Sequence, residues 1–188
     1  MSKLNLVVVS GNLSAPSKTL GLASQITEAI QRLTPVDLHI HQLAELAPVF
    51  GPARNPLELT ATGHAVLRSI ENADLLIAVT PVYKGAYTGA FKHLLDFLDP
   101  KALTGIPVIL GATGGGEKHA LIIEHQLRPL FGFFSAQTVA TGIYATEQHY
   151  DGARFKDSVV LERIEAAARE GVALAQLRLG QTPLARAA

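Results

Sequence analysis

The sequence contains no cysteine. This excludes disulfide bonds, thiolate nucleophiles and cysteine metal sites. It also has no excess of basic residues, because Lys and Arg number 16 and Asp and Glu number 16, and the formal net charge is therefore zero. Proteins that bind nucleic acid without sequence preference usually carry a basic excess, so we expect no nucleic-acid partner.

Long apolar runs are also missing, and none approaches the length of a membrane span. The residues before the first apolar run are too few for a signal peptide, so we expect a cytoplasmic protein with no membrane partner. Charged residues make up only 17% of the chain and hydrophobic residues 48%. This balance argues against disorder and suits a single domain over residues 1–179, followed by a frayed tail over residues 180–188.

Apolar periodicity predicts alternating strands and helices. Five runs have the composition of strands: residues 4–9, 36–40, 74–80, 106–111 and 136–144. Five segments have apolar residues at helical spacing: residues 20–33, 63–72, 88–98, 117–131 and 157–179. Residues 43–60 are rich in proline and glycine, and we expect a long loop there.

This alternation predicts an α/β fold, because successive parallel strands need a crossover helix. Right-handed crossovers leave few arrangements. Five strands favour a flavodoxin-like three-layer sandwich, with a parallel sheet of order 2-1-3-4-5 and helices on both faces. Ligands of such sheets bind beyond the carboxyl ends of the strands, at the switch point between strands 1 and 3. Function should therefore be sought in the loops after strands 1, 3 and 4.

The loop over residues 10–19 has the composition of a phosphate cradle at the start of a helix. Its polar side chains include those of Asn12, Ser14, Ser17, Lys18 and Thr19. Neither the P-loop nor the dinucleotide-binding glycine pattern is present. The alternative interpretation is an ordinary polar loop in which Ser17 is the helix N-cap.

The next two loops suit a flat ligand. Tyr83 and Tyr87 lie in residues 80–89, where aromatic faces and backbone amides together match a heteroaromatic ring; the alternative is a turn whose tyrosines pack on the domain. Residues 113–116 contain three consecutive glycines, which allow close approach of a ligand or another chain, although such a triplet is often only a flexible turn.

Together these loops resemble those of the NAD(P)H-dependent FMN reductases. The segments that carry the resemblance are Gly11-Asn12-Leu13-Ser14-Ala15-Pro16-Ser17-Lys18-Thr19, Thr80-Pro81-Val82-Tyr83-Lys84 and Thr113-Gly114-Gly115-Gly116. The similarity covers nearly the whole chain. It is greatest to the sulfonate-assimilation branch, and within it to methanesulfonate-associated reductases, which supply free reduced flavin to a separate monooxygenase.

The resemblance implies FMN and NAD(P)H as cofactors, and a flavin-dependent sulfonate monooxygenase as partner, reached by transient contact or by diffusing reduced FMN. The residues that it assigns to cofactor binding are Gly11, Asn12, Ser14, Ser17, Lys18, Thr19, Pro81, Val82, Tyr83, Lys84, Thr113, Gly114, Gly115 and Gly116. The family's first loop reads Gly-Ser-x-Arg-x-x-Ser. Here Asn12 replaces the Ser and Ser14 replaces the Arg, so we expect Lys18 or main-chain amides to compensate for the lost charge.

A flavin reductase needs no catalytic side chain, because the hydride passes directly from nicotinamide C4 to flavin N5. Three functions stay open: an FMN reductase with diffusible flavin, a quinone or azo-compound reductase with tightly held FMN, and a flavodoxin-type electron carrier. Carriers are typically strongly acidic, which disfavours the third for this neutral chain. No motif distinguishes NADH from NADPH.

His125 is singled out by the resemblance. In the sulfonate branch an extra residue, commonly Tyr, forms a π-bulge at a subunit interface near the flavin, and His125 matches that position; this implies a modulatory role in flavin exchange. The alternative is a partly exposed helical histidine. The helix over residues 117–131 carries more apolar surface than one side can hide, which predicts a homodimer or homotetramer.

Other candidate sites lack support. His39 and His41 would share one face of a strand, but no third ligand is evident, and we expect no metal site. Asp96 and Asp99 are interpreted as surface charges on a helix. The Gly-x-Ser-x-Gly elbow of hydrolases is absent, and so are the acidic residues that a phosphoacceptor domain needs after its first strand.

Overall fold

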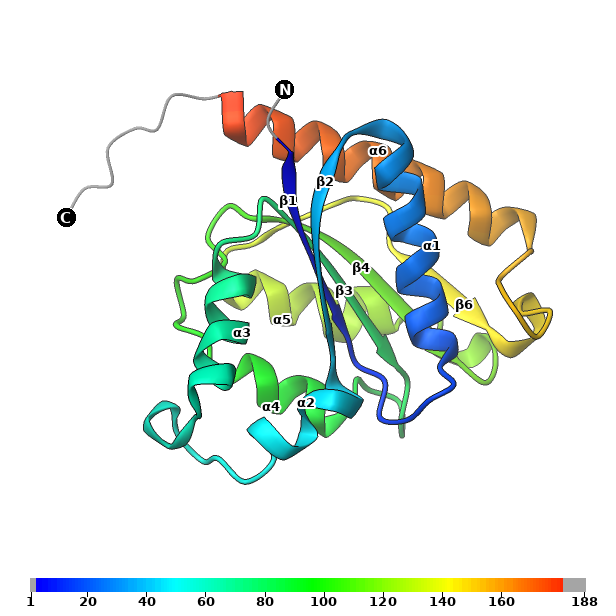
Figure 1. Ribbon diagram of the computed structural model, residues 1–188. Helices are drawn as coiled ribbons and strands as arrows, with labels where there is room; N and C mark the ends of the chain where they lie inside the picture. Colours follow the sequence, from blue (N-terminus) through cyan, green and yellow to red (C-terminus); the bar gives the residue numbers. More distant parts are fainter. Residues whose placement is uncertain (1–2, 181–188) are drawn as a thin grey trace.

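The computed structural model describes residues 3–180. A single parallel sheet with strand order β2-β1-β3-β4-β5 forms its centre, and β6 pairs with β4 as well (Figure 1). The strands are β1 (Leu4–Ser10), β2 (Val36–Gln42), β3 (Leu75–Pro81), β4 (Pro107–Gly114), β5 (Gln137–Thr138) and β6 (Ile143–Thr146). The order confirms the flavodoxin-like prediction and places the switch point between β1 and β3.

Helices cover both faces of the sheet. Helices α1 (Lys18–Leu33) and α6 (Ser158–Gly180) pack on one face, where Leu6 and Val8 of β1 join the same apolar cluster. On the other face, Val7 and Val9 pack with α2 (Leu43–Phe50), α3 (Ala61–Glu71), α4 (Gly89–Leu95) and α5 (Arg128–Phe133). Because alternate residues of a strand point to opposite faces, the continuous apolar run of β1 serves two cores.

The prediction of a long loop over residues 43–60 is wrong, because this segment contains helix α2 and a short 3-10 turn, η1 (Pro56–Glu58). Pro48 lies inside α2, where it removes one backbone donor. Leu43, Leu46 and Phe50 are nevertheless buried at spacings of three and four. Their burial stabilises a helix that local propensity disfavours.

The last strand expected over residues 136–144 is divided in two. β5 pairs with the start of β4 and β6 with its end. Between them, Arg128 donates to the carbonyls of Val139 (2.9 Å) and Ala140 (3.2 Å), and the Glu170 carboxylate accepts from the Thr141 N–H (2.9 Å). Side chains thus satisfy these backbone groups in place of β4, and the ladder is interrupted.

The prediction of one continuous helix over residues 117–131 is also wrong. This segment consists of the 3-10 turn η2 (Glu117–His119), the π-helical segment η3 (Ile123–Leu127) and α5. The Arg128 N–H donates to the Ile123 carbonyl five residues earlier, which defines the π turn. His125 lies inside η3, where the resemblance implied a bulge; its role in flavin exchange stays a prediction.

The remaining boundaries shift little. The helix expected over residues 88–98 ends at Leu95. Gly180, expected to begin the tail, is the last residue of α6, and residues 181–188 lie outside the described residues. Among residues 3–180, no helix combines the length and apolar character that crossing a membrane requires.

Candidate functional site

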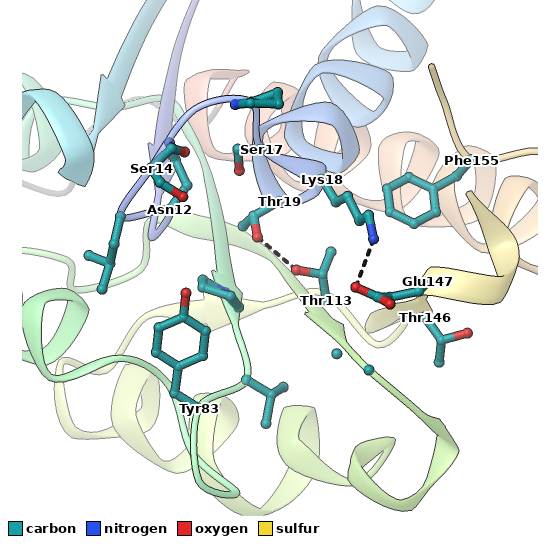
Figure 2. A pocket seen from close by; sticks show the side chains of 16 residues that line it. Asn12, Ser14, Ser17, Lys18, Thr19, Tyr83, Thr113, Thr146, Glu147 and Phe155 are labelled. Carbon is teal, nitrogen blue, oxygen red and sulfur yellow. Dashed lines mark hydrogen bonds and ion pairs between the residues drawn. The ribbon is translucent and has the colours of Figure 1, made fainter. Parts of the chain in front are cut away.

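A cavity of about 270 Å³ lies at the carboxyl ends of β1, β3 and β4, where the fold predicts a ligand (Figure 2). Its walls come from the loops that follow these strands and from the segment after β6. The lining residues are Asn12, Leu13, Ser14, Pro16, Ser17, Lys18, Thr19, Pro81, Val82, Tyr83, Thr113, Gly114, Gly115, Thr146, Glu147 and Phe155. The structure therefore joins the three predicted loops in one site.

Three predicted residues, Gly11, Lys84 and Gly116, do not line the cavity. Gly11 is buried, and a Cβ atom there would lie 2.9 Å from the Thr80 hydroxyl. Because Gly11 has no side chain, the end of β1 can lie against β3. The Gly11 N–H donates a hydrogen bond to the Val79 carbonyl of β3 (2.7 Å). The role that the structure shows for Gly11 is close packing beneath the site.

Lys84 and Gly116 occupy turns beside the cavity. Lys84 and Gly85 both have positive φ, at the tip of a hairpin closed by two backbone hydrogen bonds between Tyr83 and Ala86. This geometry points Lys84 to the exposed surface. Gly116 precedes η2, and its carbonyl accepts a hydrogen bond from the Tyr144 hydroxyl (2.6 Å).

The start of α1 forms the polar wall of the cavity. Ser17 is the N-cap, and its Oγ accepts from the Leu20 N–H at 3.1 Å, as the alternative interpretation of this loop expected. The Thr19 and Thr113 hydroxyls form a buried hydrogen bond of 2.7 Å that joins α1 to β4. The first N–H groups of a helix have no acceptor within it, so this wall presents donors and a positive dipole end.

The tyrosines of the second loop have different roles. Tyr83 lines the cavity with half of its surface exposed (51%). Tyr87 does not line it; its ring packs on Phe91, with the ring centroids 6.2 Å apart. Tyr83 is therefore the aromatic face offered to a ligand, whereas Tyr87 is partly buried and packs against the core.

The glycine loop is held by Tyr144. A Cβ atom on Gly114 would lie 2.3 Å from the Tyr144 hydroxyl, so this position has no room for a side chain. Burial and the Glu117 carboxylate raise the pKa of Tyr144, which keeps the hydroxyl protonated as a donor. A Cβ atom on Gly115 would meet nothing within 4 Å, and the backbone at Gly115 therefore borders open cavity space.

Sequence reasoning missed five lining residues. Leu13 and Pro16 lie within the predicted first loop. Thr146 is the last residue of β6 and Glu147 follows it; β6 ends two residues beyond the expected strand. The rule that ligands bind at carboxyl strand ends would have found this pair had it been applied to the last strand. Phe155 lines the cavity at the end of the 150–155 turn; the Asp151-Gly152 dipeptide signals this turn, but nothing in it indicates a site.

The two histidines of β2 have partners within the protein. His39 lies 3.6 Å from Asp37, and His41 shares a hydrogen bond with Ser69 (2.9 Å). Burial, and to a smaller extent His39, lower the pKa of His41. Among residues 3–180, no three His, Asp or Glu side chains gather as metal ligands.

Comparisons with known proteins agree with this geometry. Residues 4–151 match the family described as NADPH-dependent FMN reductase. The chain is 46% identical over 165 residues to the NADH-dependent FMN reductase SfnF of Pseudomonas putida, covering 87% of this chain and 89% of that one. It is 41% identical over 173 residues to the FMN reductase (NADPH) of Pseudomonas aeruginosa, covering 92% and 93%. An oxidoreductase from Corynebacterium diphtheriae has a similar crystal structure, with TM-score 0.83, 34% identity and coverage of 94% and 97%.

Proposed function

Because the chain belongs to the NADPH-dependent FMN reductase family, we propose that it supplies reduced FMN to a separate flavin-dependent sulfonate monooxygenase. The chain is a flavin reductase, an oxidoreductase that uses FMN and NAD(P)H. The observation that carries the finer proposal is the 46% identity to SfnF, together with the loop resemblance to the sulfonate-assimilation branch.

The lining of the cavity fits FMN. A phosphate monoester has several oxygens to satisfy, and the first loop together with the start of α1 offers the Ser14, Ser17 and Thr19 hydroxyls beside free helix amides. The side-chain-free backbone at Gly115 leaves room for the polar edge of a ring, and Tyr83 offers an apolar face. These features match the two chemically different ends of a flavin mononucleotide.

The chemistry belongs to the cofactor: FMN bound here would supply the hydride acceptor for a reduced nicotinamide. The protein's residues orient and bind. Helix α1 would hold the phosphate end, the backbone of residues 113–115 would bind the ring edge, and the exposed Tyr83 would contact the ring. Of the lining residues, only Lys18 and Glu147 carry charge, and they pair with each other at 2.7 Å. No lining group is positioned as a free acid or base, and direct hydride transfer needs neither.

Steady-state oxidation of NADH and NADPH, with and without added FMN, tests this function. We expect little turnover by the purified protein alone and a rate that rises and saturates with FMN. A protein that retains stoichiometric FMN and reduces quinones or azo compounds without added FMN would instead be a reductase of that class. Absence of nicotinamide oxidation under all conditions would favour an electron carrier.

A second assay tests the monooxygenase partner. The reductase, FMN and a nicotinamide are added to a flavin-dependent sulfonate monooxygenase, and sulfite release from methanesulfonate is measured. We expect sulfite only when the reductase is present. The same NADH or NADPH oxidation without sulfite release would contradict the partner but not the reductase activity.

We also propose that the π-helical segment lies at a subunit interface and keeps flavin exchangeable. His125 is exposed there, and large apolar side chains nearby are exposed too, with Leu121 at 61% and Phe133 at 67%. Patches of this kind typically mark interaction surfaces. Deleting His125 should restore an α-helical turn, slow FMN release and alter the dimer or tetramer measured by light scattering. A deletion variant with parental mass and parental FMN release would contradict this role.

A further inference from the structure

The charged lining of the cavity consists of one cation and one anion. Within the part of the chain that the structure describes, Lys18 and Glu147 are the only charged residues among those lining it. The Lys18 Nζ atom lies 2.7 Å from the Glu147 Oε1 atom, and Figure 2 shows the two side chains directed at each other. The cavity wall therefore has no net side-chain charge.

Different elements bring the two groups together. Lys18 is the first residue of α1, directly after the Ser17 cap. Glu147 begins the 3-10 turn η4 (Glu147–His149), directly after β6, whose last residue Thr146 lies beside Gly114 of β4. The N–H of Thr146 donates to His149 Nδ1 (3.0 Å), which holds this turn in place. The pair thus links the start of α1, which forms the polar wall of the cavity, to the end of β6.

A carboxylate at this position opposes phosphate binding. A phosphate monoester carries a charge of about −1.5 to −2 at neutral pH, and Lys18 is the cation at the start of α1. Glu147 neutralises that cation and repels an incoming phosphate. The attraction between the two side chains also lowers the pKa of Glu147, so the carboxylate stays ionised. An enzyme that releases its flavin after each turnover benefits from such weakening.

We infer that Glu147 lowers the affinity of the site for FMN, because it holds Lys18 away from the phosphate. Riboflavin has no phosphate, so Glu147 also reduces the preference of the site for FMN over riboflavin. This inference rests on the proposed function, in which the FMN phosphate lies at the start of α1. It identifies Glu147 as a residue that tunes affinity and exchange rate. Hydride transfer does not require it.

Two substitutions and a matched control test this inference. Glu147→Gln removes the charge and Glu147→Lys reverses it, and dissociation constants for FMN and riboflavin are measured by quenching of flavin fluorescence. The control is Glu165→Gln. Glu165 forms a comparable exposed ion pair with Arg32, outside the cavity, and its substitution changes the net charge by the same amount as Glu147→Gln.

We expect FMN to bind more tightly to Glu147→Gln, roughly two- to fivefold as is typical of exposed charge pairs, and more tightly still to Glu147→Lys. FMN release should slow in the same order, and the gain should shrink at high salt. Riboflavin, which lacks the phosphate, should bind all variants alike, and Glu165→Gln should match the parent for both flavins.

Three results would overturn the inference: equal tightening by Glu165→Gln, equal tightening for FMN and riboflavin, or unchanged FMN affinity in both Glu147 variants. Each leaves FMN binding by the parent intact, so the proposed function would survive. A parent protein that binds neither flavin and oxidises no nicotinamide would contradict the proposed function itself.

Discussion

The buried hydrogen bond between Thr19 and Thr113 should couple the stability of α1 to that of β4. The two hydroxyl oxygens lie 2.7 Å apart and belong to residues that are only 4% and 8% exposed. Replacing either residue with valine keeps the shape of the side chain and removes one hydroxyl. Replacing both removes the donor and the acceptor together. The three variants therefore form a double-mutant cycle around one contact.

The magnitudes follow from what each variant leaves behind. A buried hydroxyl without its partner costs about 1–3 kcal/mol of unfolding free energy, whereas replacing both partners with apolar groups of equal shape is nearly neutral. Thr113→Val leaves the more buried Thr19 hydroxyl without its partner, and we expect the free energy of unfolding to fall by about 2 kcal/mol. Thr19→Val leaves the less buried Thr113 hydroxyl without its partner, so about 1 kcal/mol is expected. The double variant should be nearly neutral, far from the sum of the single losses.

Urea unfolding followed by circular dichroism measures these differences. The assay is run without added FMN, because a ligand that binds only the folded state would add its own stabilisation. For a domain of this size, 1 kcal/mol corresponds to a shift of about 2–4 °C in Tm, which thermal melts can check. If the double variant loses the sum of the single losses to within about 0.5 kcal/mol, the hydroxyls do not interact and the reasoning fails.

Two further predictions concern the glycine loop and the π-helical segment. Gly115→Ala adds a methyl group that meets no protein atom within 4 Å and borders the cavity. FMN binding, measured by fluorescence quenching, should therefore weaken about tenfold with little change in Tm. Gly132→Ala in α5, also unobstructed, is the control and should bind FMN like the parent. Equal FMN affinity in both would place the ligand away from the glycine loop. The hydrogen bond from Arg128 lowers the pKa of Glu124 below its ordinary value of 4.5, so the stabilisation by this pair is complete above that pH and is lost as the pH falls through the lowered value. Glu124→Gln should therefore lose less stability than the parent on acidification below pH 4.5 in urea unfolding, and identical pH profiles would show that the pair contributes nothing.

The local sequence was sufficient for the architecture and for most of the cavity. Apolar runs such as the one in β1 can be buried only between two layers, which predicts a parallel sheet covered by helices. Once the strand order follows, the carboxyl-end rule brings together loops that are far apart in the chain. It thereby predicted that Thr19 and Thr113 would share one site, 94 residues apart. The Ser17 cap was also readable, because a serine before an apolar-periodic segment is a local signal.

Tertiary contacts decided what local patterns could not. Helix α2 forms despite Pro48 because burial of Leu43, Leu46 and Phe50 outweighs the lost backbone bond. The gap between β5 and β6 exists because Arg128 and Glu170 satisfy the intervening backbone.

The charge of the cavity depended on the same kind of contact. Lys18 is evident in the first loop, but its partner Glu147 lies 129 residues away in the chain. Glu147 directly follows β6, and the sequence pattern predicted that this strand would end two residues earlier than it does. Residue types and spacing predicted a crevice at the carboxyl ends of β1, β3 and β4. Only the packing of β6 against β4 determined that a carboxylate would neutralise its one cation.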